Sequence, residues 1–243
     1  MVDAYGESAE SLHLRARIYE NEGELDLAEK YYLASLQRAG FRVPDENYAV
    51  RYRLAAMYQQ RKNYKKYEDI LLGILANQNM YTDERYARLR EAYVSTLLTQ
   101  GFDSLAVLYR VSLDFAQEAH SDLGAFYCRT GRDRYALLHL AFANLAVVST
   151  LADELKRHDP GYSYSSLQDT LQKSSARPEL ADFMQRSGFF RSLYFLGSSL
   201  YALGAAEEAR KVWTAASHYA TGEWKSRSAN QLLAPRTEPL ISY

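Results

Sequence analysis

Five segments of this chain share one spacing of small and large residues. After Leu196, the matching residues are Gly197, Leu200, Gly204, Ala209, Trp213 and Ala216, at offsets +1, +4, +8, +13, +17 and +20. The same offsets carry residues of similar size after Arg15, Leu54, Leu123 and, less closely, Tyr93. Such an internal repeat restricts the fold more than composition does, because each unit must bury its face against its neighbours.

The spacing predicts two helices around a short turn in every copy. Small residues at +1 and +13 let two helix backbones approach closely, and large residues at +4 and +17 fill the space beside them. The residue at +8 separates two runs of helical period, and a glycine there can adopt positive φ and end a helix. Lys62 holds this position in the second copy, so that turn must form without glycine. The expected helices are 9–22, 24–38, 46–60, 63–76, 83–99 and 103–117.

This pattern resembles the tetratricopeptide repeat, a helix-turn-helix unit of about 34 residues. That family favours Leu-Gly or Leu-Ala, then Tyr, Gly, Ala, an aromatic residue and Ala, and the copies at Leu123 and Leu196 match this order best. The resemblance implies an all-α fold, a right-handed superhelical solenoid of about five helix pairs. It implies one domain over residues 1–232, with repeats at 9–42, 48–81, 87–119, 117–150 and 190–223.

The repeat rhythm breaks between the fourth and fifth copies. No Gly or Pro interrupts residues 132–157, and residues 178–203 keep a helical pattern despite Gly188. We therefore expect two extended helices there, packed antiparallel and projecting beyond the repeats. Residues 158–177 are expected to form an irregular insertion, with room for a short helix over 166–173. The stretch "GEWKSRSANQLLA" predicts a capping helix, and two prolines predict a loose or docked tail over 233–243.

Charge and cysteine content exclude few classes of protein. The net charge of −1 gives no general attraction for nucleic acid or membranes. The single cysteine, Cys128, allows no internal disulfide, which fits a reducing compartment. No apolar run reaches the length of a membrane span, and the N-terminal stretch lacks signal-peptide features. A cytoplasmic protein without a transmembrane segment is the expectation.

No residue pattern points to catalysis or to a cofactor. The five histidines do not pair with each other, with cysteine or with carboxylates at metal-ligand spacing in the sequence: His13, His120, His139, His158 and His218. Nucleophile-elbow and phosphate-binding glycine motifs are also missing. The expectation is therefore a non-enzyme with no metal and no cofactor. Cys128 is interpreted as a small buried apolar residue.

Tyrosine content and charge distribution suggest binding faces. There are 21 tyrosines, more than the repeat packing positions account for, and tyrosine suits interfaces. Residues 1–47 hold five Lys or Arg and ten Asp or Glu, whereas residues 48–90 hold nine Lys or Arg and four Asp or Glu. Neighbouring repeats that attract each other explain this pattern. A basic patch for an acidic peptide or RNA also explains it, although the balanced net charge argues against nucleic acid.

In the family that the repeats resemble, the first helix of each pair lines a concave groove that binds a peptide or a partner helix. Matching positions in this chain give the predicted groove residues: His13, Arg17, Asn21, Tyr52, Gln59, Arg88, Ser95, Arg129, Tyr194 and Tyr201. Chaperone-binding members hold a terminal carboxylate with Lys and Asn, but this chain has His13 and Arg17 at those positions in its first copy. The usual carboxylate clamp is therefore not expected.

These observations lead to three hypotheses about function. The first is a non-catalytic scaffold or adaptor that binds another protein as part of a larger assembly. The alternative is a ligand-sensing or transport-associated module with a small-molecule or peptide pocket, which should be enclosed and apolar with a few converging polar groups. The third is self-association through the long helices or the ends of the solenoid.

Overall fold

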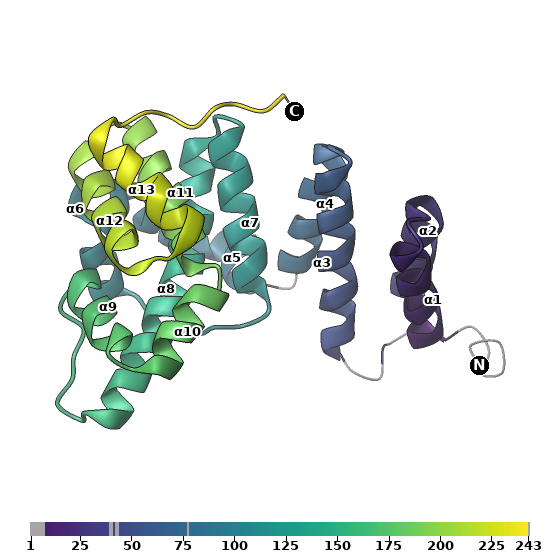
Figure 1. Cartoon of the computed structure of the whole chain (residues 1–243), viewed down its shortest axis with the longest axis horizontal. Helices are drawn as coiled ribbons and strands as arrows, with labels where there is room; N and C mark the ends of the chain where they lie inside the picture. Colours follow the sequence, from purple (N-terminus) through teal and green to yellow (C-terminus); the bar gives the residue numbers. More distant parts are fainter. Residues whose placement is uncertain (1–7, 39–40, 42–43, 77, 243) are drawn as a thin grey trace. The chain divides into compact units, whose positions relative to one another are not determined.

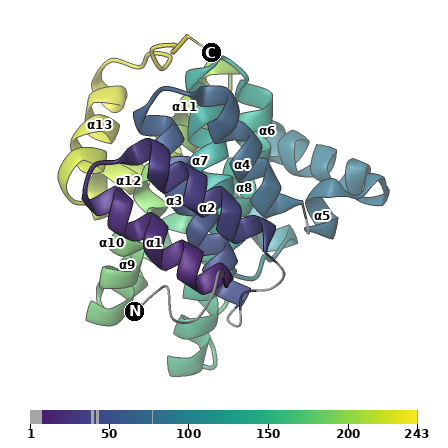
Figure 2. The same ribbon diagram turned by 90° about the vertical axis from the view of Figure 1, so that its right-hand side faces the viewer.

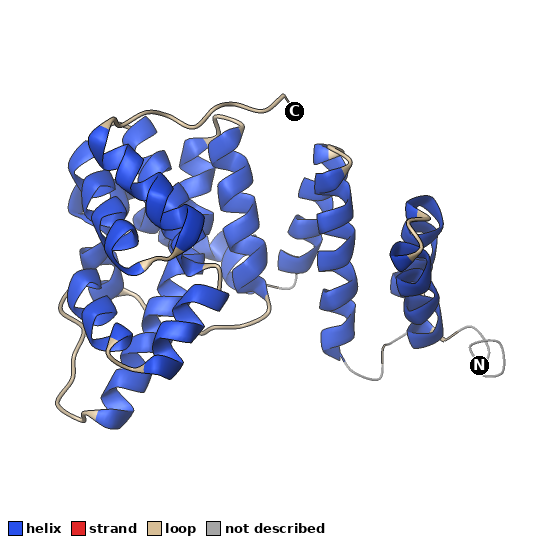
Figure 3. Ribbon diagram, viewed as in Figure 1, coloured by secondary structure: helices blue, strands red, loops and turns tan. Residues whose placement is uncertain are grey.

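A computed structural model describes residues 8–38, 41, 44–76 and 78–242. All regular secondary structure in these residues is helical, as Figure 3 shows by its single colour for ordered elements. The all-α prediction is therefore confirmed. The chain divides into two compact units, Met1–Asn77 and Gln78–Tyr243, where the sequence led us to expect a single array of repeats.

The first unit holds two helix pairs. The helices are α1 (Ala9–Asn21), α2 (Leu25–Gln37), α3 (Pro44–Gln60) and α4 (Tyr64–Leu75). Figure 2 shows α1 and α2 side by side, and they pack together as α3 and α4 do. These bounds lie close to those that the repeat spacing predicted for the first two copies.

The second unit holds the remaining copies and the elements between them (Figure 1). Its elements are α5 (Asn79–Thr82), the 3-10 helix η2 (Glu84–Tyr86), α6 (Ala87–Leu108), α7 (Ala116–Arg129), α8 (Asp133–His158), α9 (Leu167–Ser175), α10 (Pro178–Arg186), α11 (Phe189–Ala202), α12 (Ala206–Tyr219) and α13 (Gly222–Leu233). Helix α8 lies in the middle of this unit, packed against α6, α7, α9 and α11.

The backbone at the +8 position has positive φ in all five copies, whereas ψ of Gly101 is extended at 179°. The residues and their φ values are Gly23 (80°), Lys62 (56°), Gly101 (83°), Gly131 (72°) and Gly204 (87°). Lys62 is the one residue other than glycine with positive φ in the described part of the chain. In four copies the backbone N–H at +9 also donates to the carbonyl at +4, as in the bond from Arg132 to Tyr127 (2.8 Å). These bonds satisfy carbonyls at the helix end, so the turn follows from local chemistry.

Small and large residues of the repeat lie directly opposite each other. A Cβ atom added to Gly197 would lie 2.5 Å from Nε1 of Trp213, and one added to Gly124 would lie 2.5 Å from Cγ of Leu140. These pairs are the +1 and +17 positions of their copies. In these two copies, glycine at +1 is therefore required for close contact between the two helices of the pair.

Only one of the two expected extended helices is present. Helix α8 runs from Asp133 to His158, close to the expected 132–157. The predicted helix 178–203 is wrong: the segment forms α10 and α11, separated at Gly188, which adopts φ of 70°. Helical periodicity continues through this position, so the pattern did not reveal the break.

Two further boundaries differ from the prediction. The expected helix 103–117 ends at Leu108, and α7 begins only at Ala116. Within residues 158–177, the short helix expected over 166–173 is present as α9, which Ser166 caps by accepting from the backbone N–H of Asp169 (3.1 Å). Ser, Thr, Asp and Asn side chains commonly start helices in this way.

Helix α8 is long and apolar enough to cross a membrane by length and composition, contrary to the sequence-based expectation. In the structure, 83% of its most apolar window is buried against neighbouring helices. Its apolar residues thus form the core of the second unit, and a core helix passes the same test of length and composition.

Candidate peptide-binding face

The C-terminal segment lies across three helices of the second unit. Figures 1 and 2 show it leaving the end of α13 and running past the end of α7. It makes hydrogen bonds to α7, α11 and α13 through Arg129, Tyr194, Arg227 and Gln231, and we call these four residues the peptide-binding face. The tail, expected to be loose or docked, is docked.

Gln231 binds the main chain of the segment with both ends of its side-chain amide. Its Oε1 accepts from the backbone N–H of Arg236 (2.9 Å), and its Nε2 donates to the carbonyl of the same residue (3.0 Å). Gln231 is only 3% exposed, so its amide is held in place by the surrounding helices. This contact recognises an extended backbone, whatever side chain the bound residue carries.

Glu238 is the anchor of the segment. Its carboxylate accepts from the Tyr194 hydroxyl through Oε1 and from Nη2 of Arg227 through Oε2 (2.9 Å). Gln231 donates to the same hydroxyl oxygen (3.3 Å). Glu238 is 7% exposed, and a buried carboxylate of this kind requires such partners.

Aromatic rings surround the Arg227 guanidinium. Its central carbon lies 4.5 Å from the ring centroid of Tyr194, 5.2 Å from that of Trp224 and 5.9 Å from that of Phe195. Cation–π contacts of this kind orient a guanidinium. Burial, and the hydrogen bond to Glu238, raise the pKa of Tyr194 above its usual value, so the hydroxyl stays a donor at neutral pH.

The end of α7 makes the third contact. The backbone N–H of Ile241 donates to the carbonyl of Arg129 (2.9 Å), the last residue of this helix. Carbonyls at a helix C-terminus lack partners within the helix and are available for such a bond. The segment is thus held at three points along its length.

Only two of the predicted groove residues contact this segment. Arg129 contributes its carbonyl and Tyr194 its hydroxyl. Tyr194 is only 3% exposed, because the segment covers it and its hydroxyl is bonded to Glu238. Tyr201 lies half-buried near Trp213, with ring centroids 5.9 Å apart.

The other predicted groove residues lie on α1, α3 and α6. His13 is buried on α1, with Nδ1 3.7 Å from Oε2 of Glu46. The remaining residues are exposed or half-buried on the first helices of their copies: Arg17 and Asn21 on α1, Tyr52 and Gln59 on α3, and Arg88 and Ser95 on α6.

Sequence reasoning missed the contribution of α13, which we interpreted only as a cap. Trp224, Arg227 and Gln231 follow one another at intervals of three and four residues, which places them on one helix face. An aromatic, a cationic and an amide residue on one face of a terminal helix form a pattern that suits peptide binding. That signal was available in the sequence.

The uneven charge of the first ninety residues is explained in part by attraction between neighbouring repeats. In the first unit, Glu20 accepts from Tyr32 (2.6 Å) and from Nη1 of Arg53 (2.9 Å). Glu29 likewise accepts from Tyr58 (3.1 Å), Arg61 (3.1 Å) and Lys66 (2.6 Å). Several basic residues of α3 and α4 thus pair with acidic residues of α1 and α2.

A histidine pair lies in the core of the second unit, and the spacing of the sequence did not reveal it. The Nδ1 atoms of His120 on α7 and His139 on α8 are 3.0 Å apart, so one ring donates to the other. Burial lowers the pKa of His120 to about 3. The pKa of His139 is also well below its usual value because of burial and the neighbouring His120.

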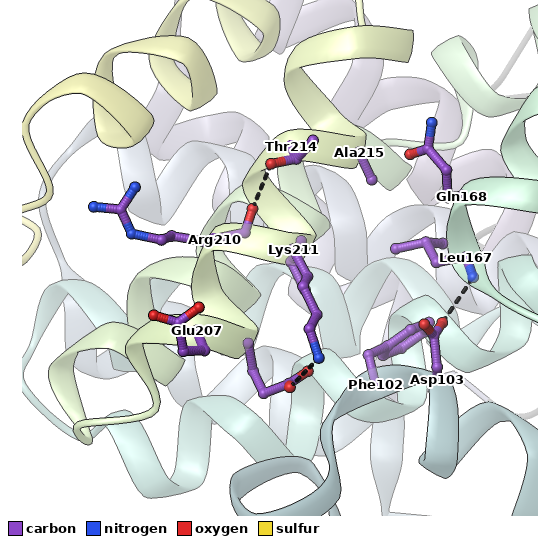
Figure 4. Close-up of a pocket in the computed structure, with 11 residues that line it drawn as sticks. Phe102, Asp103, Leu167, Gln168, Glu207, Arg210, Lys211, Thr214 and Ala215 are labelled. Atoms are coloured by element: carbon purple, nitrogen blue, oxygen red, sulfur yellow. Dashed lines mark hydrogen bonds and ion pairs between the residues drawn. The ribbon is translucent and has the colours of Figure 1, made fainter.

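A surface pocket of about 380 Å³ lies between α6, α9 and α12 (Figure 4). Its polar side chains largely bind one another. Asp103 accepts from the Tyr164 hydroxyl (2.7 Å) and the backbone N–H of Leu167 (2.7 Å), and Lys211 donates to Glu208 (2.6 Å). Figure 4 shows Arg210 pointing away from Phe102 and Asp103. Few of these side chains therefore keep a hydrogen-bonding group available to a ligand in the pocket.

Other chemical groups do not form a site in the part of the chain described here. No three His, Cys, Asp or Glu residues among residues 8–38, 41, 44–76 and 78–242 are arranged to hold a metal ion. Cys128 is buried, and burial raises the pKa of its thiol, which makes it a poor nucleophile. Comparison of the chain with protein-family models, curated proteins and solved structures gave no match.

Proposed function

We propose that this protein is a non-catalytic scaffold whose second unit binds an extended peptide of another protein across α7, α11 and α13. One observation carries the proposal: the peptide-binding face already holds an extended segment, residues 236–241, through main-chain and side-chain hydrogen bonds. A repeat module of the tetratricopeptide type is the architecture we propose for it, because each copy turns at +8 with positive φ.

The contacts suit a peptide supplied by another chain. Gln231 and the Arg129 carbonyl bind main-chain groups, which every extended peptide offers at non-proline positions. These groups lie on helices, and sites on regular elements are more rigid than sites on loops. The exposed residues of the first unit, Arg17 and Gln59 among them, are the proposed location of a second contact in a larger assembly.

Selection from a displayed library of random short peptides tests this proposal. The full chain and the full chain with Glu238→Ala serve as targets, and each is also presented with Gln231→Leu, which removes both main-chain bonds. Gln168→Leu, an exposed amide of α9, is the matched control. We expect peptides that bind the control and are lost with Gln231→Leu. The absence of Gln231-dependent peptides on both targets contradicts the proposed function.

The pocket of Figure 4 supports a second candidate, the binding of a small ligand between α6, α9 and α12. Its apolar lining includes Phe102, Leu167 and Val212, with Lys211 as the cation. A thermal-shift screen with small molecules distinguishes the two sites. A shift that is lost with Lys211→Ala and kept with Arg227→Ala assigns the ligand to this pocket, and the reverse result assigns it to the peptide-binding face.

A further inference from the structure

We propose that Tyr194 and Arg227 form a binding site for the side-chain carboxylate of an acidic residue in the partner peptide, and that Glu238 occupies this site until the partner displaces it. This inference rests on the proposed function and specifies its ligand. We call these two residues the carboxylate site. The partner is an extended acidic peptide, and the chain's own segment is its competitor.

The carboxylate site binds both oxygens of one carboxylate from two different helices. Tyr194 of α11 donates to Oε1 of Glu238 and Arg227 of α13 donates to Oε2 (2.9 Å). A bound alanine would leave the buried hydroxyl without this acceptor, and a bound glutamine would present its NH2 group to one of the two donors. Such unpaired buried groups penalise the wrong ligand more strongly than a missing apolar contact does.

The geometry of the site does not depend on Glu238 alone. Glu223, one turn earlier on α13, accepts from Nη1 of Arg227 (3.2 Å), and three aromatic rings pack around the guanidinium. Gln231 supports the Tyr194 hydroxyl from another side (3.3 Å). The donors are therefore placed before a carboxylate arrives, which lowers the entropy lost on binding.

The resident segment is held by few interactions besides this one. Glu238 is its one buried residue among 234–242, and Leu240 is 69% exposed. The segment therefore buries little apolar surface, and its advantage over a free peptide is its attachment to the chain. Such attachment corresponds to an effective concentration of about millimolar for a short linker. A partner peptide that covers the neighbouring aromatic residues would overcome this advantage.

The contacts also define a sequence rule for the partner. Relative to the acidic residue, the position two before it must supply both a backbone N–H and a carbonyl, as Arg236 does. The position three after it must supply a backbone N–H, as Ile241 does. Proline has no N–H and is excluded from both positions, whereas the position directly after the acidic residue is proline in the chain's own segment, Pro239.

Fluorescence anisotropy with a labelled synthetic peptide of residues 234–242 tests the inference. The targets are the full wild-type chain and the full chain with Glu238→Ala, which vacates the carboxylate site without altering the helices. We expect the Glu238→Ala chain to bind the peptide about tenfold more tightly than wild type does. A peptide with glutamine in place of its glutamate should bind this chain about tenfold more weakly.

Further variants of the Glu238→Ala chain locate the binding. Arg227→Ala should remove the tight binding, and Arg186→Ala, an exposed arginine on α10, should leave it unchanged. Circular dichroism of each variant checks that it is folded. Tyr194→Phe keeps the ring and removes the hydroxyl. It should lower the affinity for the glutamate peptide and leave the affinity for the glutamine peptide nearly unchanged.

Several outcomes overturn the inference. Equal affinity for the glutamate and glutamine peptides rules out a carboxylate site, and equal affinity of the two chains, or no binding to either, rules out displacement of the resident segment. A wild-type dimer that dissociates with Arg227→Ala assigns the site to the segment of a second copy. Library peptides that depend on Gln231 but lack acidic residues would leave the proposed function intact while this inference fails.

Discussion

At the scale of single residues, a few positions carry requirements that their neighbours do not share. Gly197 faces Trp213 so closely that no side chain fits, and Lys62 adopts a conformation that the other copies give to glycine. His120 and His139 are buried side by side without a carboxylate between them. Each position predicts a measurable response, because the physical constraint on it is specific.

The buried histidine pair predicts a loss of stability in acid. In the unfolded chain both imidazoles titrate near pH 6.5, whereas burial keeps them neutral in the folded chain, with the pKa of His120 at about 3. The unfolded state thus binds more protons below pH 6.5, and the free energy of unfolding falls by about 1.4 kcal/mol per pH unit for each histidine. This loss begins as the pH drops through 6.5 and continues toward pH 3.

Urea unfolding at several pH values measures this effect. The double variant His120→Leu/His139→Leu removes both titrating groups, so its free energy of unfolding should depend less steeply on pH below about 6.5. His218→Leu, an exposed histidine of α12, should keep the wild-type slope. If the free energy of unfolding depends on pH equally in the double variant and in wild type, the pair does not titrate as described.

Gly197→Ala should destabilise the second unit. The new Cβ would lie 2.5 Å from Nε1 of Trp213, a fully buried ring, so a helix must shift, at a cost of about 1–3 kcal/mol. At Gly73 of α4 the corresponding atom would meet only the flexible end of Arg51. Gly73→Ala should therefore be neutral or stabilising by about 1 kcal/mol, since alanine favours helices. The midpoint of thermal unfolding should therefore fall for Gly197→Ala and stay the same or rise for Gly73→Ala.

At the scale of helices, the sequence predicts those boundaries that local residue patterns specify. The repeat spacing predicts α1 to α4 close to their bounds, because small residues at packing positions and turns at +8 are local requirements, and the run without Gly or Pro predicts α8. The break at Gly188 and the end of α6 at Leu108 were missed. Neither interrupts the apolar period, so the periodicity alone did not reveal them. Tertiary contact decides that Glu238 docks against α11 and α13.

Lys62→Gly should stabilise the first unit by about 1 kcal/mol, because the left-handed conformation is unfavourable for a residue with a Cβ atom. Its φ of 56° is the strained value that the other copies assign to glycine. Lys65→Gly, a nearby change that removes the same charge from inside α4, should instead destabilise by about 1 kcal/mol. Urea unfolding in parallel compares them, and a Lys62→Gly chain less stable than wild type would contradict the strain argument.

At the scale of the whole molecule, the chain divides between residues 77 and 78 into two units, and we propose a different role for each. The second unit contains the peptide-binding face, the segment that occupies it and the core helix α8. All contacts that we describe for peptide binding lie within it. The first unit contributes charged networks between its own helix pairs.

A fragment of residues 78–243 should therefore fold on its own. We expect helical circular dichroism and one cooperative thermal transition, because a compact unit with its own core is sufficient for both. The fragment should also keep its C-terminal segment docked, so Glu238→Ala should increase its affinity for the labelled peptide as in the full chain. A fragment without a cooperative transition would show that the second unit needs the first.

The most direct test of the account is a crystal structure of the full Glu238→Ala chain with a bound acidic peptide. We predict that the peptide lies extended across α7, α11 and α13, with its carboxylate on Tyr194 and Arg227 and its main chain on Gln231. A peptide bound between α6, α9 and α12, or on the first unit alone, would contradict the claim that the peptide-binding face is the functional site.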